Sequence, residues 1–125
     1  MANYRGILLQ SNTTFVENSA FDLNFIIKDD NNDILEDLSN YKFRAEITDG
    51  AQELKKKDAN HTGGSASQIS VSGKVMTIHV DTDDTDNWNG FYECEVEMEN
   101  KSSGAVYTIW KKNLKEIKDE QLDWN

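Results

Sequence analysis

The sequence contains no proline and a single cysteine, Cys94. One thiol cannot form an intrachain disulfide, and it excludes a cysteine-based metal site, which needs several thiolates. Without proline, the edge strands of any sheet must be protected from further pairing by charged side chains. No run of about 18 apolar residues occurs, so no membrane-spanning helix is predicted. The first residues lack the apolar stretch of a signal peptide, so we expect a protein made in the cytoplasm that stays there or leaves within a larger assembly.

Basic residues are also scarce, because 13 lysines and arginines stand against 23 acidic residues, for a net charge of -10 over 125 residues. This length suits one domain with one hydrophobic core. A surface of this sign repels nucleic acid and anionic membranes, so neither is expected as a partner. The charge is explained by solubility, with a basic protein partner as the alternative.

What the sequence does contain is alternation of apolar and polar residues, which is typical of β-strands with one buried face. The alternating segments are 21–27, 41–47, 69–71, 76–80 and 92–98, with a weaker strand at 52–56 and a last strand at 105–112. In the last strand Val106 and Trp110 oppose Tyr107 and Ile109, so its facing is ambiguous. This pattern predicts an all-β fold, an immunoglobulin-like antiparallel β-sandwich of about seven strands.

We divide the chain into a sandwich, residues 1–112, and a C-terminal segment, residues 113–125. Leu114, Ile117, Gln121 and Trp124 lie at helix-like spacing in this segment, but the apolar stripe is thin. The sequence therefore predicts either a short helix or an extended arm, and both stay open.

The segment Gly90-Phe91-Tyr92-Glu93-Cys94 resembles the strand F motif of immunoglobulin domains. In that motif a glycine precedes a corner tyrosine, whose hydroxyl bonds to the backbone upstream and fixes the corner between strands E and F. The resemblance implies that Gly90, Tyr92 and Cys94 form a structural corner. Trp88 replaces the usual aspartate, and the partner cysteine is absent, so an antibody-type domain is not expected.

A longer resemblance covers residues 5 to 112 and depends on the order of several short segments. These are DLSNYKFRAEI at 37–47, GKVMTI at 73–78, WNGFY at 88–92 and GAV at 104–106. Their order resembles small immunoglobulin-like domains of tailed-bacteriophage structural proteins, including the N-terminal domain of baseplate upper proteins. The resemblance implies a virion component, of baseplate, tail or head, that holds other proteins together.

Residues suited to catalysis or metal binding are few. Cys94 is predicted to face inward and His79 outward, so they cannot form a nucleophile–base pair. The acidic segments 29–33 and 81–86 offer oxygen ligands for Ca²⁺, but neither follows the EF-hand register. Turns formed by their Asp and Asn side chains are favoured over a metal site. We expect no catalytic residue, no metal and no cofactor.

The strand at 92–98 exposes glutamates at alternate positions, namely Glu93, Glu95, Glu97 and Glu99. In an immunoglobulin-like sheet this strand lies beside segment 41–47, which exposes Lys42 and Arg44. We therefore expect cross-strand ion pairs, with a binding stripe for a basic partner as the alternative.

The C-terminal region is the most basic part of the chain and carries exposed aromatic candidates. The residues predicted to bind a partner are Trp110, Lys111, Lys112, Leu114, Ile117 and Trp124. Aromatic side chains commonly act as anchors in protein interfaces. Together with an edge strand and the loop at 50–66, the termini would make the assembly contacts.

These observations predict a non-enzymatic structural or adaptor module of a bacteriophage virion that binds other virion proteins or forms a homo-oligomer. One alternative is a carbohydrate-binding module that uses its tryptophans as a platform. Another is an acidic inhibitor that mimics nucleic acid, which would need an ordered array of carboxylates.

Overall fold

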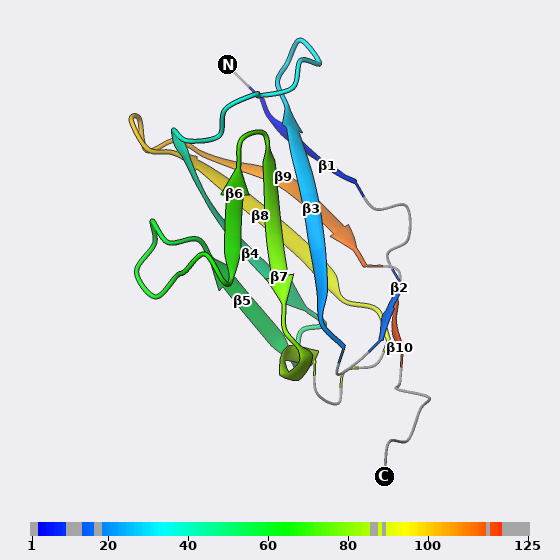
Figure 1. Ribbon diagram of the computed structural model, residues 1–125. Coiled ribbons are helices and arrows are strands. Elements are labelled where there is room, and N and C mark those ends of the chain that lie inside the picture. The colour runs from blue at the N-terminus through cyan, green and yellow to red at the C-terminus, as the bar shows by residue number, and fades with distance from the viewer. Residues whose placement is uncertain are drawn as a thin grey trace.

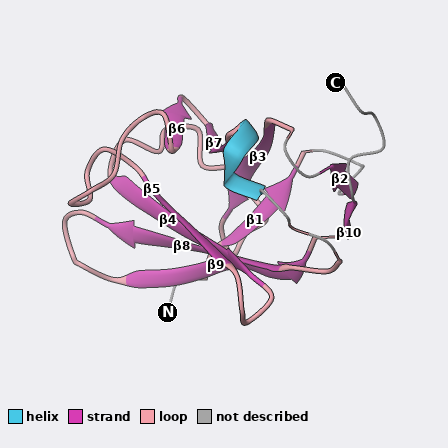
Figure 2. Ribbon diagram, turned by 90° about the horizontal axis from the view of Figure 1, so that it is seen from below, coloured by secondary structure: helices cyan, strands magenta, loops and turns pink. Residues whose placement is uncertain are grey.

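The computed structural model describes residues 3–9, 14–16, 19–85, 88, 90–114 and 116–118, of which 14–16 and 116–118 are described by their backbone alone. Two four-stranded antiparallel sheets pack face to face (Figures 1 and 2). The first contains, in spatial order, β1 (Arg5–Leu8), β3 (Phe21–Lys28), β7 (Val75–Val80) and β6 (Ile69–Ser72). The second contains β5 (Glu53–Lys57), β4 (Tyr41–Thr48), β8 (Glu93–Asn100) and β9 (Val106–Asn113).

In immunoglobulin nomenclature these orders are A-B-E-D and C′-C-F-G, so the predicted all-β, immunoglobulin-like sandwich is confirmed. All seven predicted strands are present, and β1 is an eighth that the sequence did not reveal. Its four residues are too few to show a period of two.

The core lies between the sheets and is filled by the inward residues of the alternating strands. Leu23, Phe25 and Ile27 of β3 are fully buried, whereas Asp22 on the other face is exposed. The inward residues of β4 and β8 are Phe43, Ala45, Ile47, Cys94, Val96 and Met98, all at most 6% exposed. Burial of a large apolar side chain contributes about 1.5–3 kcal/mol, so these two inner faces are the main source of stability.

The ambiguous facing of β9 is explained by a β-bulge, at which the register shifts opposite Val96 and Glu97. Ile109 is the additional residue of the bulged strand. Tyr107, Ile109 and Trp110 therefore all contribute to the inner side, with Ile109 4% exposed and the two aromatic rings packed against the core. No simple alternation can place these three residues on one side, which is why the sequence pattern was inconclusive.

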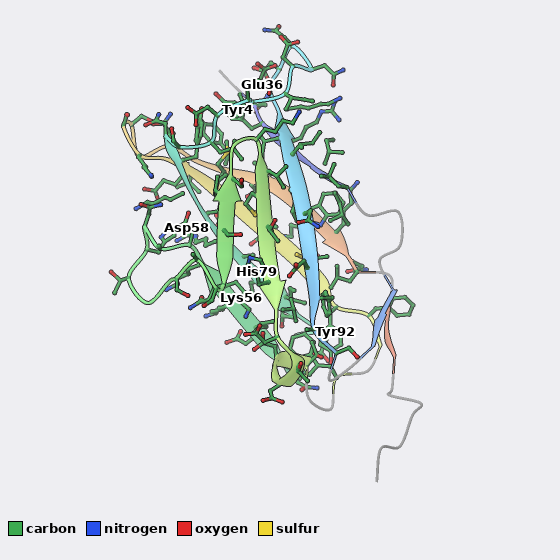
Figure 3. All side chains as sticks on the ribbon, in the orientation of Figure 1. Tyr4, Glu36, Lys56, Asp58, His79 and Tyr92 are labelled. Carbon is green, nitrogen blue, oxygen red and sulfur yellow. The ribbon has the colours of Figure 1, made fainter. Side chains whose placement is uncertain are left out.

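On the side of the sandwich formed by β5 and β6, residues 58–68 join the two sheets. Oδ2 of the buried Asp58 (Figure 3) accepts a hydrogen bond from the N–H of Phe43 at 2.8 Å. Oε1 of Gln68, which immediately precedes β6, accepts the N–H of Lys57 at 3.0 Å. A Cβ at Gly64 would lie 1.9 Å from the Asp58 carbonyl oxygen, so only glycine fits there. These contacts hold the loop against the sandwich.

After β9 the chain continues into β10 (Glu116–Lys118), which pairs in parallel with β2 (Thr14–Val16). This part of the C-terminal segment is therefore extended, which agrees with the extended arm and not with the short helix, the two alternatives that the sequence left open. The 3-10 helix η1 (Thr82–Thr85) is the helical element of the described residues. No helix in the described ranges is long and apolar enough to cross a membrane.

Candidate functional site

A groove of about 490 Å³ lies between β1 and β9, the end strands of the two sheets on one side of the sandwich. Its lining residues are Arg5, Gly6, Ile7, Leu8, Thr108, Ile109, Trp110, Lys111 and Lys112. The two strands are in contact at Gly6, where a Cβ would lie 3.3 Å from the Ile109 carbonyl oxygen. Among the strands that the structure describes, β1 is paired only with β3 and β9 only with β8. Of the predicted partner residues, Trp110, Lys111 and Lys112 line this groove, and β1 forms its opposite wall.

Backbone polar groups of both strands point toward this groove. The N–H of Leu9 donates to a carbonyl on the β3 side at 2.8 Å. Because successive residues of a strand direct their backbone groups to opposite sides, the N–H and C=O of Leu8 point away from β3 and toward β9. The N–H of Leu114 donates to a carbonyl on the β8 side at 2.7 Å. By the same alternation along the strand, the N–H and C=O of Lys111 point away from β8 and toward β1. Strand edges of this kind are templates for the addition of another strand.

Trp110 is the aromatic residue of the groove, and it is half-buried. Its ring meets that of Phe25 edge-on at 5.3 Å between centroids, and the ammonium of Lys112 lies 4.7 Å above it. Its indole Nε1 is buried and has no acceptor among the described residues.

The groove is basic although the chain as a whole is strongly acidic. Arg5, Lys111 and Lys112 line it, and no acidic residue does. Lys111 is partly neutralised from the outer face by Glu95, at 3.4 Å, and Arg5 donates to the side chain of Asn32. The groove therefore offers positive charge beside an apolar ring, which suits an acidic partner with apolar side chains.

The remaining predicted partner residues do not line the groove. Leu114 is only 1% exposed and belongs to the core, so its assignment to a partner surface is corrected. The thin apolar stripe of the C-terminal segment concealed this, because Leu114 packs as the last inward residue after β9. Ile117 lies in β10, whose backbone alone is described, and Trp124 lies outside the described residues.

The predicted corner is built around Tyr92 (Figure 3), which is 1% exposed. Its ring stacks on that of Trp88 at 4.3 Å with an angle of 5°, and Gly90 between them has a φ of 103°. The Tyr92 hydroxyl accepts a hydrogen bond from Gln52 at 3.3 Å, in the turn between β4 and β5. Backbone N–H groups of that turn, foremost that of Gln52, lower the pKa of Asp49, and the Tyr92 hydroxyl assists. The tyrosine thus braces this neighbouring turn.

Cys94 follows in β8 and is fully buried. Burial raises the pKa of its thiol to about 12, and the neighbouring Glu93 and Glu95 add to the shift. Because the thiolate is the reactive form, this cysteine is a packing residue and not a nucleophile.

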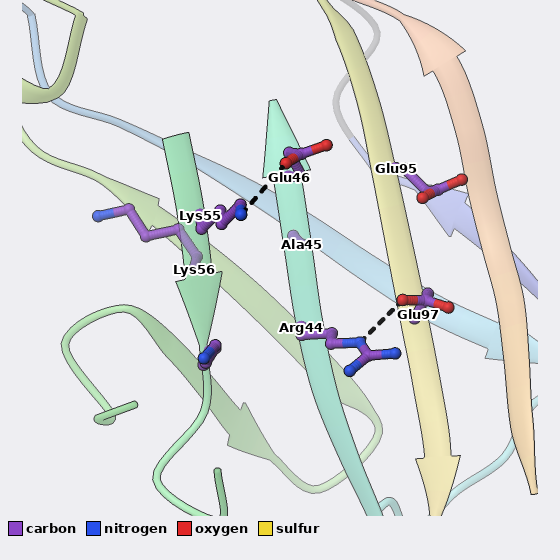
Figure 4. Close-up of a pocket in the computed structure, with 8 residues that line it drawn as sticks. Arg44, Ala45, Glu46, Lys55, Lys56, Glu95 and Glu97 are labelled. Atoms are coloured by element: carbon purple, nitrogen blue, oxygen red, sulfur yellow. Dashed lines mark hydrogen bonds and ion pairs between the residues drawn. The ribbon is translucent and has the colours of Figure 1, made fainter. Parts of the chain in front are cut away.

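Three of the four outward glutamates of β8, namely Glu95, Glu97 and Glu99, form cross-strand ion pairs, as the sequence predicted. Lys42 of β4 lies 3.3 Å from Glu99. Arg44 of β4 lies 2.8 Å from Glu97 (Figure 4). Glu46 and Glu95 are directly opposite each other, and Lys55 and Lys111 relieve this repulsion at 4.0 Å and 3.4 Å. Most charged side chains that line the shallow pocket on this face therefore take part in ion pairs.

The outer face of the other sheet carries a hydrogen-bonded chain of Ser70, His79 and Asp22 that the sequence analysis missed. His79 (Figure 3) bonds to Ser70 Oγ through Nε2 at 2.8 Å and to Asp22 Oδ1 through Nδ1 at 2.9 Å. The three residues come from adjacent strands, so only the register β6–β7–β3 reveals them. The Asp22 side chain is 53% exposed, so this chain lacks the water-excluding surroundings that make such groups catalytic.

The first acidic segment, 29–33, forms a turn held by an Asp side chain, as expected, whereas residues 82–85 of the second form the 3-10 helix η1. Oδ1 of Asp29 accepts the N–H groups of Asn31 and Asp33 at 2.9 Å and 3.0 Å. In the second segment, Asp84 accepts from Lys56 and from the N–H of Asp81, both at 2.7 Å. No three His, Cys, Asp or Glu side chains of the described residues are grouped so as to hold a metal ion.

The chain matches no protein-family model and no curated protein. Among solved structures it is similar to an endo-β-1,4-mannanase from Thermotoga petrophila, with a TM-score of 0.50 and 12% sequence identity. The similarity covers 98% of this chain but 20% of the mannanase chain, so the chain spans about a fifth of that protein's length. At this identity the likeness supports the fold alone.

Proposed function

We propose that this chain is a non-enzymatic adaptor module that binds an extended segment of another protein in the groove between β1 and β9. The observation that carries the proposal is a groove that is bordered by two strand edges and lined by basic side chains and a tryptophan. The backbone groups of Leu8 and Lys111 would supply main-chain hydrogen bonds. Trp110 and the basic side chains would select apolar and acidic residues of the partner.

The setting that we propose is the virion of a tailed bacteriophage, where the partner is another virion protein or a second copy of the chain. This part of the proposal depends on the order of short segments that resembles phage immunoglobulin-like domains. An immunoglobulin-like sandwich with a terminal arm suits such a role, because its loops and edges are available for contacts while the core remains fixed.

A carbohydrate-binding role is the alternative that the sequence left open, and the likeness to part of a mannanase chain concerns the fold alone. Stacking of sugars on an aromatic platform needs exposed, coplanar rings. Trp88 is 4% exposed, and the tyrosine cluster of Tyr4, Tyr41 and Tyr107 packs edge to face at 61° and 76°. Mimicry of nucleic acid is likewise disfavoured, because the glutamate row is paired with lysine and arginine.

The groove is tested with a display library of random peptides selected on the immobilised full chain. We expect enrichment of sequences that alternate apolar and acidic residues, and at least about tenfold weaker binding to Lys112→Glu. Lys74→Glu, in the exposed turn between β6 and β7, is the matched control and should bind like the wild type. Peptides indifferent to Lys112→Glu, or a chain that binds glycans and no peptide, would refute the proposal.

A further inference from the structure

The two outer faces of the sandwich differ in chemistry. The strands of the second sheet carry Glu46, Glu53 and the glutamate row of β8. In the first sheet, β1, β3, β7 and β6 carry one acidic residue, Asp22, although 23 of the 125 residues of the chain are acidic. Depletion of charge is the composition that distinguishes the centre of a protein interface from the rest of a surface. Figure 1 looks onto the outer face of this first sheet, with β6, β7 and β3 in front of the second sheet.

Aliphatic side chains cross this outer face in a row. Ile7 of β1 lies directly opposite Ile26 of β3, and the register of β3 with β7 places Val75 on the other side of Ile26. All three are half-buried, while the residues that alternate with them in β3 and β7 are in the core. Leu9, directly after β1, is 51% exposed and extends the row. We call these four side chains the outer patch.

The polar side chains beside the outer patch are hydrogen-bonded to one another. Thr77 Oγ1 donates to Asn24 Oδ1 at 2.7 Å. The next row of the face holds the hydrogen-bonded chain of Ser70, His79 and Asp22 (Figure 3). Polar groups that already have partners cost less to bury than unpaired ones. The face can therefore be covered without leaving these side chains unsatisfied.

The charges on this face lie at its two ends. Asp22 and Lys28 stand at opposite ends of β3, about 20 Å apart at about 3.3 Å per residue, and both are on the outer side. Arg5 pairs with Lys28 across β1 and β3, so that end is basic. A two-fold axis that crosses the strands near Phe25, midway along β3, would set Asp22 of each copy opposite Lys28 of the other. The same axis would lay one outer patch over the other, so the face is complementary to itself.

We propose that the outer face of the first sheet binds the same face of a second copy of this chain, with the outer patches in contact and Asp22 paired with Lys28 in both directions. The contact is isologous and therefore closes at a dimer. Face-to-face packing of sheets with their strands nearly aligned is a common arrangement. The inference goes beyond the proposed function, because it uses the face of a sheet and not the strand edges at the groove.

The size of the face sets the expected strength of the contact. Four strands about 4.8 Å apart and about 20 Å long form a face of roughly 20 Å by 20 Å. Two such faces would bury on the order of 1,000 Å² in total, which is typical of weak, transient interfaces. We therefore expect an equilibrium between monomer and dimer in the micromolar range or above.

Sedimentation equilibrium of the full chain, from about 1 μM to about 1 mM, measures this equilibrium. Ile26→Lys should weaken the dimer at least about tenfold, because it places a charge in the centre of the outer patch. The matched control is Val106→Lys, which changes an exposed aliphatic residue on the outer face of the other sheet, opposite Glu99. This control should dimerise like the wild type.

Reversal of one charge at each end of the face tests the alignment of the two copies. Lys28→Glu and Asp22→Lys should each weaken the dimer at least about tenfold. The two variants shift the net charge in opposite directions, so a loss that they share cannot come from net charge. The double variant has the net charge of the wild type and should recover most of the association. Thermal unfolding should show that all variants are folded.

A monomer over the whole range, a dimer that Ile26→Lys leaves unchanged, or an oligomer larger than a dimer would overturn the inference. Single charge reversals that the double variant does not rescue would also overturn it. The proposed function fails separately, because peptide selection on the groove does not require a dimer. Peptides that depend on Lys112, together with a monomeric chain, would support the groove and overturn the contact between outer faces.

Discussion

The ion pair between Lys56 and Asp84 offers the sharpest test of the packing, because a lysine side chain faces the core. Lys56 (Figure 3) lies in β5 opposite Ala45, and its ammonium is 2.7 Å from Oδ2 of Asp84. Asp84 lies in η1 and also accepts the N–H of Asp81 at 2.7 Å. The pair therefore fixes the acidic turn after β7 to the edge of the second sheet.

The magnitude follows from the exposure of each partner, which is 7% for the Lys56 side chain and 23% for Asp84. Breaking a fully buried pair costs about 3–5 kcal/mol, and an exposed pair contributes about 0–1 kcal/mol. We expect Lys56→Met to lower the free energy of unfolding by about 2–3 kcal/mol, because Asp84 keeps partial access to water. Asp84→Asn should cost more, since it leaves the more deeply buried ammonium without its counter-charge.

Urea unfolding at neutral pH measures both variants and the double variant, with unchanged m-values as the condition for comparison. The double variant should be more stable than the sum of the single losses predicts, because neither charge is then left alone. Added salt should change these differences little, since a buried pair is weakly screened. Losses below about 1 kcal/mol that simply add would refute the buried pair.

Three further predictions concern other parts of the fold. Gly64→Ala should lower the free energy of unfolding by about 1–3 kcal/mol, because its Cβ would meet the Asp58 carbonyl oxygen at 1.9 Å; an unchanged urea midpoint would contradict the tight loop. Cys94 should react with a thiol reagent at pH 8 only as fast as the protein unfolds, because burial raises its pKa to about 12; rapid labelling of the folded chain would contradict this burial. Deletion of residues 113–125 should cost at least about 2–5 kcal/mol through loss of the buried Leu114; a truncated chain as stable as the wild type would contradict the placement of Leu114.

The sandwich could be predicted from the sequence wherever one face of a strand is buried. In β3, β4 and β8 the period of two assigned each side chain to the core or to solvent. The same alternation predicted the pairing of Lys42 and Arg44 with the glutamate row, because the order of strands in this fold places β4 beside β8. Local pattern and tertiary structure agree in these strands.

The features that the sequence did not reveal depend on contacts between distant segments. Lys56 faces inward only because Asp84, in η1, meets it, and three consecutive lysines in β5 conceal which one does so. The bulge at Ile109 disrupts the alternation in β9, which is the strand that lines the groove. The opposite wall, β1, is too short to show a pattern. Of the residues that line the groove, the sequence singled out Trp110 and the two lysines that follow it, and their role in binding a partner stays a prediction.

The most direct test of the groove is amide hydrogen exchange of the full chain, alone and mixed with the best peptide from the selection. Binding as an added strand should slow exchange at Leu8 and Lys111, whose N–H groups point toward the groove. The N–H of Val71, on the outer edge of β6, should exchange at the same rate in both samples. Protection at Val71 instead, or no protection at either wall of the groove, would contradict the account.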